Sequence, residues 1–263
     1  MKPLEMAMRI NEELEGLGYK EKYKIKQISD SETVRSKILI VVGLEGGAGA
    51  TSVAEGLAQE FALYYGKKVC HISFDSFGGG ENLRKLLYYW KKGGVLHKIA
   101  PDYFIPDENN VFGIFKGRSI QGINPLLMMD VNDAVQFIED VKTKLDFDYI
   151  IVDMSILLYK LYAEILGIAE KTVLVSKENA EKIVKIAEEN KTKSTICVLN
   201  FADRYKDCVK DECDKNVTKD NESLKRLEIS TIEVDEEIAE SSCIKVDGVF
   251  GIGIKNLAER IEF

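Results

Sequence analysis

The sequence predicts a doubly wound α/β domain, in which a mostly parallel sheet carries helices on both of its faces. Short apolar runs alternate along the chain with segments whose apolar residues recur at helical spacing. The first run, Ile38–Val42, is apolar at every position, which is typical of a strand buried on both faces. Strands that alternate with helices pair in parallel, because parallel neighbours need a crossover connection. We expect one such domain over residues 37–263.

The order of the elements follows from the spacing of apolar residues and from the turn residues between the runs. Strands are predicted at residues 38–42, 68–75, 149–153, 172–176, 195–200 and 229–234. Helices are predicted at residues 53–64, 132–145, 178–189 and 254–261. One further helix is predicted after the second strand from the spacing of four apolar residues, Leu83, Leu86, Leu87 and Trp90. The alternative is that Tyr88, Tyr89 and Trp90 form a docking patch, since Tyr and Trp are enriched at binding hot spots.

Two segments do not fit the alternation. The first 36 residues are predicted to be an appendage, with helical spacing over residues 6–17, a strand-like alternation over 23–28 and a polar linker over 29–36. Residues 205–226 are dense in Lys, Asp and Glu, which is typical of a solvated surface insertion. We therefore divide the chain into an N-terminal appendage, residues 1–36, and an α/β domain, residues 37–263.

The composition excludes several classes of protein. Among 263 residues there are 36 Lys and Arg against 44 Asp and Glu, which gives a formal net charge of −8. Because phosphate neutralisation requires a basic face, this acidic chain is a poor general nucleic-acid binder. The longest apolar runs are far shorter than the ~20 residues of a membrane-spanning helix. The N-terminus also lacks the pattern of a signal peptide. We expect a soluble cytoplasmic protein.

The cysteines and histidines give little support for metal or nucleophilic chemistry. The five cysteines are odd in number and show no CxxC spacing, so we expect no cysteine metal site. Only two histidines occur, His71 and His97, and we therefore expect no histidine-centred nucleophilic triad.

The most informative segment is Val42–Ser52, with the sequence VGLEGGAGATS. A buried strand runs directly into a glycine-rich turn, and a helix is predicted to start at about Thr51. Glycines let consecutive backbone N–H groups point inward, and a helix N-terminus adds unpaired donors and the positive end of its dipole. The Thr51 hydroxyl is placed to contact a Mg²⁺ ion. The segment predicts a phosphate-binding loop, although a glycine-rich turn that binds nothing is the alternative.

This segment is similar to the deviant Walker A motif of the MinD/ParA group of P-loop ATPases, and the likeness extends over nearly all of residues 37–263. The resemblance implies an ATP and Mg²⁺ site. The nucleotide-binding residues that it implies are Glu45, Gly46, Gly47, Ala48, Gly49, Ala50, Thr51, Ser52 and Asn200. Asn200 would recognise the adenine edge, and residues 233–240 correspond to a family loop near the base.

The resemblance also implies the residues around the metal. Asp75 ends a strand similar to the family's switch I segment and would orient the attacking water as the catalytic residue. Asp153 ends a strand similar to Walker B. The implied Mg²⁺ site therefore consists of Thr51, Asp75 and Asp153.

Several positions depart from the family's pattern. The P-loop lysine falls on Ala50 and the signature lysine falls on Glu45, while Leu44 replaces the first loop glycine. The segment Asp153–Ser155 lacks the usual proline. Phosphoryl transfer needs positive charge where negative charge develops, and the loss of one such group typically costs roughly 10²–10³ in rate. Glu45 would place a carboxylate near the phosphates. We expect weak ATP hydrolysis or none.

This loss of lysines resembles the TadZ/CpaE branch, which is associated with assembly of tight-adherence pili. The branch implies an ATP-dependent homodimeric scaffold that binds a protein of a pilus, secretion or cell-pole complex. Such a partner would recruit a cytoplasmic chain to the cell pole or to the inner face of the membrane. The C-terminus lacks a basic amphipathic extension, so we expect no direct membrane insertion, and we expect no specific nucleic-acid partner.

Two alternative functions stay open. The first is an active ATPase of the partitioning or division-site class, in which Lys177, Arg84 or Lys85 replaces the missing lysine. The second is a pseudo-ATPase that acts as an interaction module and binds no nucleotide.

Overall fold

The structure is a computed structural model that describes residues 36–74, 80–107, 109–113, 124–177, 186, 195–200, 228–232 and 248–262. The chain divides into two units, Met1–Thr33 and Val34–Phe263, and the described residues all belong to the second. The predicted appendage, apart from Ser36, lies outside the described residues, as do Asp75 and residues 205–226 and 233–240. Of the predicted helix 178–189, only Ile186 is described.

The second unit is built on one eight-stranded sheet with the order β3-β4-β2-β5-β1-β6-β7-β8. The antiparallel pair is β3 with β4, and the other pairings are parallel. This confirms the predicted doubly wound, mostly parallel sheet. The strands are β1 (Lys37–Gly43), β2 (Val69–Ser73), β3 (Ile105–Pro106), β4 (Val111–Gly113), β5 (Tyr149–Ser155), β6 (Lys171–Ser176), β7 (Thr195–Asn200) and β8 (Glu228–Ile232).

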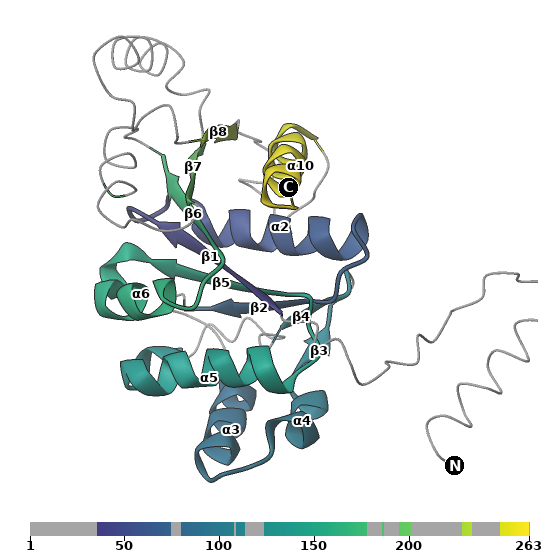
Figure 1. Cartoon of the computed structure of the whole chain (residues 1–263), viewed down its shortest axis with the longest axis vertical. Coiled ribbons are helices and arrows are strands. Elements are labelled where there is room, and N and C mark those ends of the chain that lie inside the picture. The colour runs from purple at the N-terminus through teal and green to yellow at the C-terminus, as the bar shows by residue number, and fades with distance from the viewer. Residues whose placement is uncertain are drawn as a thin grey trace, which may run out of the picture. The chain divides into compact units, whose positions relative to one another are not determined.

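Helices cover both faces of the sheet (Figure 1). On one face lie α2 (Ala50–Leu63) and α10 (Gly248–Glu262). On the other lie α3 (Gly80–Lys91), α4 (Leu96–Ile99), α5 (Val131–Lys144) and α6 (Tyr159–Leu166). The 3₁₀ turns are η1 (Ala100–Asp102), η2 (Pro125–Met128) and η3 (Ile156–Leu158).

Strand β1 is central and buried on both faces, as its sequence predicts. Ile38, Ile40 and Val42 belong to the core under α3, α5 and α6. Leu39 and Val41 belong to the core under α2 and α10. A parallel strand with helices on both sides has no solvated face, which is why each position of this run is apolar.

The strand order defines a switch point at the carboxyl end of β1. Strands β5, β2 and β4 follow on one side of β1, whereas β6, β7 and β8 follow on the other. In open α/β sheets, ligands bind in the crevice outside the carboxyl ends of the strands, where the strand order reverses. The segment that follows Gly43 lies at this point.

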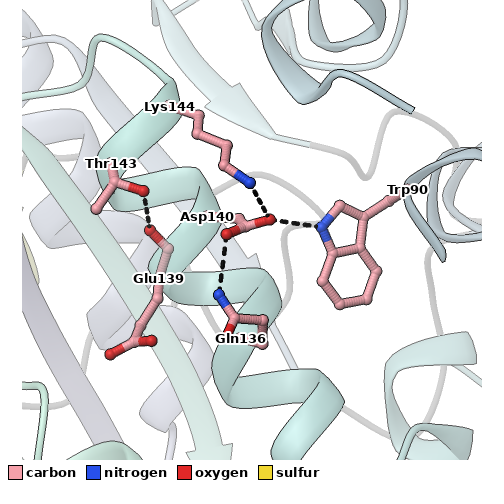
Figure 2. Close-up of polar contacts among 6 residues, drawn as sticks. All are labelled: Trp90, Gln136, Glu139, Asp140, Thr143 and Lys144. Carbon is pink, nitrogen blue, oxygen red and sulfur yellow. Dashed lines mark hydrogen bonds and ion pairs between the residues drawn. The ribbon is translucent and has the colours of Figure 1, made fainter. Parts of the chain in front are cut away.

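The helix predicted after the second strand is α3, and its buried side is the predicted stripe. Leu83, Leu86 and Leu87 are buried in the core, whereas Tyr88 and Tyr89 are exposed. The Trp90 indole packs on this core and donates a hydrogen bond to Asp140 of α5 at 2.9 Å (Figure 2). Trp90 therefore ties α3 to α5.

Helix α10 begins at Gly248, six residues earlier than the spacing predicts. Its first two turns contain glycines. These glycines interrupt the apolar spacing in the sequence, and in the structure they allow close packing. A Cβ built on Gly253 would lie 3.1 Å from Ile232 of β8, and one built on Gly56 of α2 would lie 3.0 Å from Ile254. These glycines let α10 approach both β8 and α2 closely.

Candidate functional site

The site is centred on the segment between β1 and α2, which we call the glycine loop (Gly43–Gly49). Gly47 and Gly49 adopt φ angles of +71° and +82°, a conformation that L-residues avoid and glycine accepts. Gly49 caps α2, whose first turn contains no acidic residue, so no side chain of that turn neutralises the positive end of the helix dipole. The predicted helix start near Thr51 is thus within one residue of Ala50, where α2 begins.

Two buried residues fix the glycine loop on the sheet. Leu44, at the position of the family's first glycine, is buried, and its N–H donates to the Val175 carbonyl at 2.9 Å. Ala48 is also buried, and its carbonyl accepts a hydrogen bond from Asn200 Nδ2 at 2.9 Å. Between them, Gly46 and Gly47 are exposed, so the outer side of the loop is open to solvent.

Asn200 thus connects the end of β7 to the glycine loop. Its side chain is 2 % exposed, and the sequence placed it in the site only through the resemblance. In the structure, the hydrogen bond from Asn200 to Ala48 holds the glycine loop in place. Recognition of adenine by this amide stays a prediction.

Glu45 directs its carboxylate toward the end of β6. Its Oε1 accepts a hydrogen bond from the Ser176 hydroxyl at 2.7 Å and one from the Lys177 backbone N–H at 2.6 Å. The sequence predicts a carboxylate near the phosphates, and the structure adds that this carboxylate joins the loop to the neighbouring strand. That contact could not be foreseen, because it depends on which strand lies beside β1.

The structure brings together Thr51 and Asp153, two of the three residues of the predicted metal site. Thr51 Oγ1 donates to Asp153 Oδ2 at 2.7 Å. Asp153 is 1 % exposed, and it lies next to Val41 of β1 and Ser73 of β2 in the sheet register. Ser52 and Ala50 lie beside Thr51 in the first turn of α2 and are half-buried.

His71 is the site residue that sequence reasoning missed. Its Nε2 lies 2.7 Å from Asp153 Oδ1, and the residue is buried. Burial alone would lower the pKa of His71, but the hydrogen bond and the negative charge of Asp153 outweigh it and raise the pKa. The signal was present: the alternation of β2 places His71 on the same face as Val69, toward α2.

Asn124 is a second residue that the sequence did not single out. It is buried, and its Nδ2 donates to the Ser73 carbonyl at 2.8 Å. Its Oδ1 also caps η2 by accepting from the Leu126 N–H at 3.1 Å. Asn124 therefore fixes the end of β2, immediately before the segment that contains Asp75. No pattern in the sequence marks this role.

The donor set fits a magnesium–nucleotide group. Mg²⁺ takes oxygen ligands, and the Thr51 hydroxyl and Asp153 carboxylate supply them beside the helix N-terminus. A Cβ built on Gly46 would meet no described atom within 4 Å, so the loop leaves room for a phosphate group. Thr51 and Asp153 would hold the ion, and the backbone N–H groups near Gly46–Ser52 would hold the phosphates.

Comparison with solved structures supports the same fold. A ParA family ATPase from Chlorobium tepidum TLS superposes with a TM-score of 0.64 at 15% identity, over 87% of this chain and 100% of that one. A putative plasmid partition protein from Borrelia burgdorferi B31, bound to AMPPNP, gives 0.56 at 16% identity, over 86% and 98%. The septum site-determining protein MinD from Pyrococcus horikoshii OT3, complexed with Mg-ADP, gives 0.57 at 17% identity, over 86% and 96%.

The chain therefore has the fold of the MinD/ParA-like P-loop ATPases. No protein-family model matches the sequence, and no curated protein matches it. Within the described part of the chain, no helix has the length and apolar character needed to cross a membrane. The same residues contain no group of three or more His, Cys, Asp and Glu side chains that could hold a metal.

Proposed function

We propose that this chain binds Mg-ATP at the glycine loop and acts as a nucleotide-dependent homodimeric scaffold with little or no hydrolysis. The observation that carries the proposal is the contact between Thr51 and Asp153, 2.7 Å apart at the N-terminus of α2. It lies at the switch point of the sheet, next to two glycines with left-handed backbone. Both features suit a polyphosphate and its cation.

The solved structures with this fold support a nucleotide as the ligand. They include the plasmid partition protein bound to AMPPNP, MinD complexed with Mg-ADP, and a cobyrinic acid a,c-diamide synthase from Mycobacterium smegmatis with a bound ATP analogue and magnesium. Another similar structure is a MinC:MinD cell division protein complex from Aquifex aeolicus, which supports a protein partner. We carry ATP, Mg²⁺ and a protein partner over to this chain as parts of the proposal.

Weak hydrolysis follows from the loop itself. Ala50 supplies no charge at the first position of α2, where the family resemblance puts a lysine. Asp75 is proposed to orient water, and a water so placed still needs a cation on the phosphates to react quickly. Binding depends less on that cation, because backbone N–H groups and the helix dipole also hold the phosphates.

The finer assignment is to the TadZ/CpaE type, with a partner in a pilus, secretion or cell-pole complex. Its support is the sequence of the loop, in which Glu45 and Ala50 stand at the two lysine positions while Asp153 is kept. We propose a cytoplasmic chain that this partner recruits to the cell pole or to the inner face of the membrane.

The test combines calorimetry with sedimentation on the full chain. We expect Mg-ATP to bind and to shift a monomer toward a dimer, and phosphate release to stay close to the buffer blank. A variant with both Thr51→Ala and Asp153→Ala should lose the shift, whereas Thr143→Ala, on the exposed side of α5, should keep it. If the chain dimerises to the same extent with and without nucleotide, a nucleotide-dependent shift from monomer to dimer is excluded. Rapid turnover would favour an active ATPase, and no binding at millimolar ATP would favour the pseudo-ATPase.

A further inference from the structure

Lys177 directly follows β6, the strand beside β1, and its side chain reaches the glycine loop. A Cβ built on Gly47 would lie 3.5 Å from Lys177 Nζ. Gly47 is exposed, and its backbone N–H is one of those proposed to hold the phosphates. The ammonium group is thus in contact distance of the loop position that a phosphate group would approach.

The backbone of Lys177 is fixed relative to that loop by Glu45. The Glu45 carboxylate accepts hydrogen bonds from the Lys177 N–H at 2.6 Å and from the Ser176 hydroxyl at 2.7 Å. Ser176 is fully buried, and the Leu44 N–H is bonded to the carbonyl of Val175, one residue earlier. Three hydrogen bonds therefore hold the end of β6 against the glycine loop.

The loop itself provides no cation. Residues 43–52 contain neither Lys nor Arg, and their one charged side chain is Glu45. A bound triphosphate carries several negative charges, and backbone N–H groups with a helix dipole neutralise only part of them. A charge-assisted hydrogen bond from an ammonium group to phosphate is about twice as strong as a neutral one. A lysine held beside Gly47 would supply the positive charge that residues 43–52 lack.

We propose that Lys177 is the phosphate-binding cation of this site and that Glu45 is the positioning residue that holds it there. This inference rests on the proposed function, because it assigns a residue to the same nucleotide site. The ligand class is a nucleoside di- or triphosphate, bound through its terminal phosphates. Since Lys177 belongs to the same chain as the loop, this cation does not have to come from a second protomer.

The test measures equilibrium binding of Mg-ATP and of inorganic tripolyphosphate to the full chain and to Lys177→Met. We expect both ligands to bind Lys177→Met about 10- to 100-fold more weakly, the range for loss of one hydrogen bond to a charged group. Lys177→Arg keeps the charge and should stay within a few-fold of the parent chain. The matched control is Lys98→Met on α4, an exposed lysine that should change binding less than about two-fold.

A second variant tests position as well as charge. In the Lys177→Met background, Ala50→Lys restores a lysine to the first turn of α2, and we expect it to recover most of the lost affinity. Thermal melting of the nucleotide-free variants verifies that each is folded, and Lys177→Gln replaces Lys177→Met if the latter is not. If Lys177→Met, or Lys177→Gln in its place, binds Mg-ATP as tightly as the parent chain does, this proposal is overturned and the proposed function is not. A parent chain that binds no ATP would overturn the proposed function, and this inference with it.

Discussion

His71 Nε2 lies 2.7 Å from Oδ1 of Asp153, whose other oxygen, Oδ2, accepts a hydrogen bond from Thr51 at 2.7 Å. The two partners come from different elements, β2 and α2, while Asp153 belongs to β5. A buried carboxylate is costly unless it is paired and hydrogen-bonded. The side chains of His71 and Thr51 therefore hold the Asp153 carboxylate in one orientation, and the contact with Thr51 ties the start of α2 to the sheet.

Replacing His71 should destabilise the protein through Asp153. The variant His71→Ala leaves Oδ1 of a buried carboxylate without this partner, which typically costs about 1–3 kcal/mol. The measurement is urea unfolding at pH 7, with His97→Ala as the control, because His97 is exposed on α4 and its loss should change stability by less than about 0.5 kcal/mol. In the double variant with Asp153→Ala, the two costs should not add. Equal stability of the two histidine variants would contradict the pairing.

The environment of Asp140 predicts that the stability of the folded protein depends on pH. It accepts hydrogen bonds from Trp90 Nε1 at 2.9 Å, Gln136 Nε2 at 3.0 Å and Lys144 Nζ at 2.6 Å (Figure 2). Burial acts to raise the pKa of Asp140, but these hydrogen bonds and the Lys144 charge together lower it. A carboxylate with a lowered pKa in the folded state stabilises the protein above its unfolded pKa. That stability is lost as the pH falls through the folded pKa.

We therefore expect Asp140→Asn to lower the free energy of unfolding by about 1–2 kcal/mol at pH 7. The difference from the parent chain should shrink as the pH falls below about 4, the usual pKa of an unfolded aspartate. The matched control is Asp133→Asn on the same helix, whose carboxylate pairs with Lys91 at 2.6 Å in an exposed ion pair. Its loss should cost less than about 1 kcal/mol. A pH-independent difference for Asp140→Asn would refute this account.

The sequence was sufficient where one side chain or one periodic run determines the structure. The run Ile38–Val42 could be assigned to a central strand because it is apolar on both faces. Thr51 could be placed at a phosphate-binding loop from the strand, glycine-rich turn and helix around it, and Asp153 was joined to the same site through the family resemblance. Local sequence patterns do not predict the contacts between neighbouring strands. The hydrogen bonds of Glu45 with Ser176 and Lys177 depend on β6 lying beside β1, an arrangement that no local pattern specifies.

The pairing of His71 and the first residue of α10 were not predicted from the sequence, for two different reasons. Two histidines give no basis for catalytic chemistry, and so the pairing of His71 with Asp153 was not anticipated. Its alternation with Val69 in β2 was the available signal. The early start of α10 was missed because glycine lowers helix propensity, whereas Gly253 is needed there for close contact with Ile232.

The backbone of the glycine loop can be tested with two alanine substitutions. Gly49 has a φ of +82°, so Gly49→Ala should destabilise the protein by about 1–2 kcal/mol. Gly46 does not have a positive φ, and a Cβ built on it would meet no described atom within 4 Å. Gly46→Ala should therefore change stability by less than about 0.5 kcal/mol in the same thermal or urea unfolding experiment. Equal losses from both variants would argue against a left-handed cap at Gly49.

Asn200 offers a way to separate two roles of one side chain. Its Nδ2 donates to the Ala48 carbonyl at 2.9 Å, and the side chain is buried. Asn200→Ala should cost about 1–3 kcal/mol of stability, because it leaves a buried carbonyl without this donor. The loosened loop should also weaken nucleotide binding.

The comparison of ATP with GTP decides whether Asn200 also recognises the base. If it only holds the glycine loop, Asn200→Ala weakens ATP and GTP binding by the same factor, because the phosphates are common to both. If it also hydrogen-bonds adenine, the variant loses more affinity for ATP than for GTP, and the preference between them falls about ten-fold or more. We expect the second result, with calorimetry of both nucleotides on the parent chain as the reference. An unchanged ratio would leave Asn200 as a residue that supports the loop.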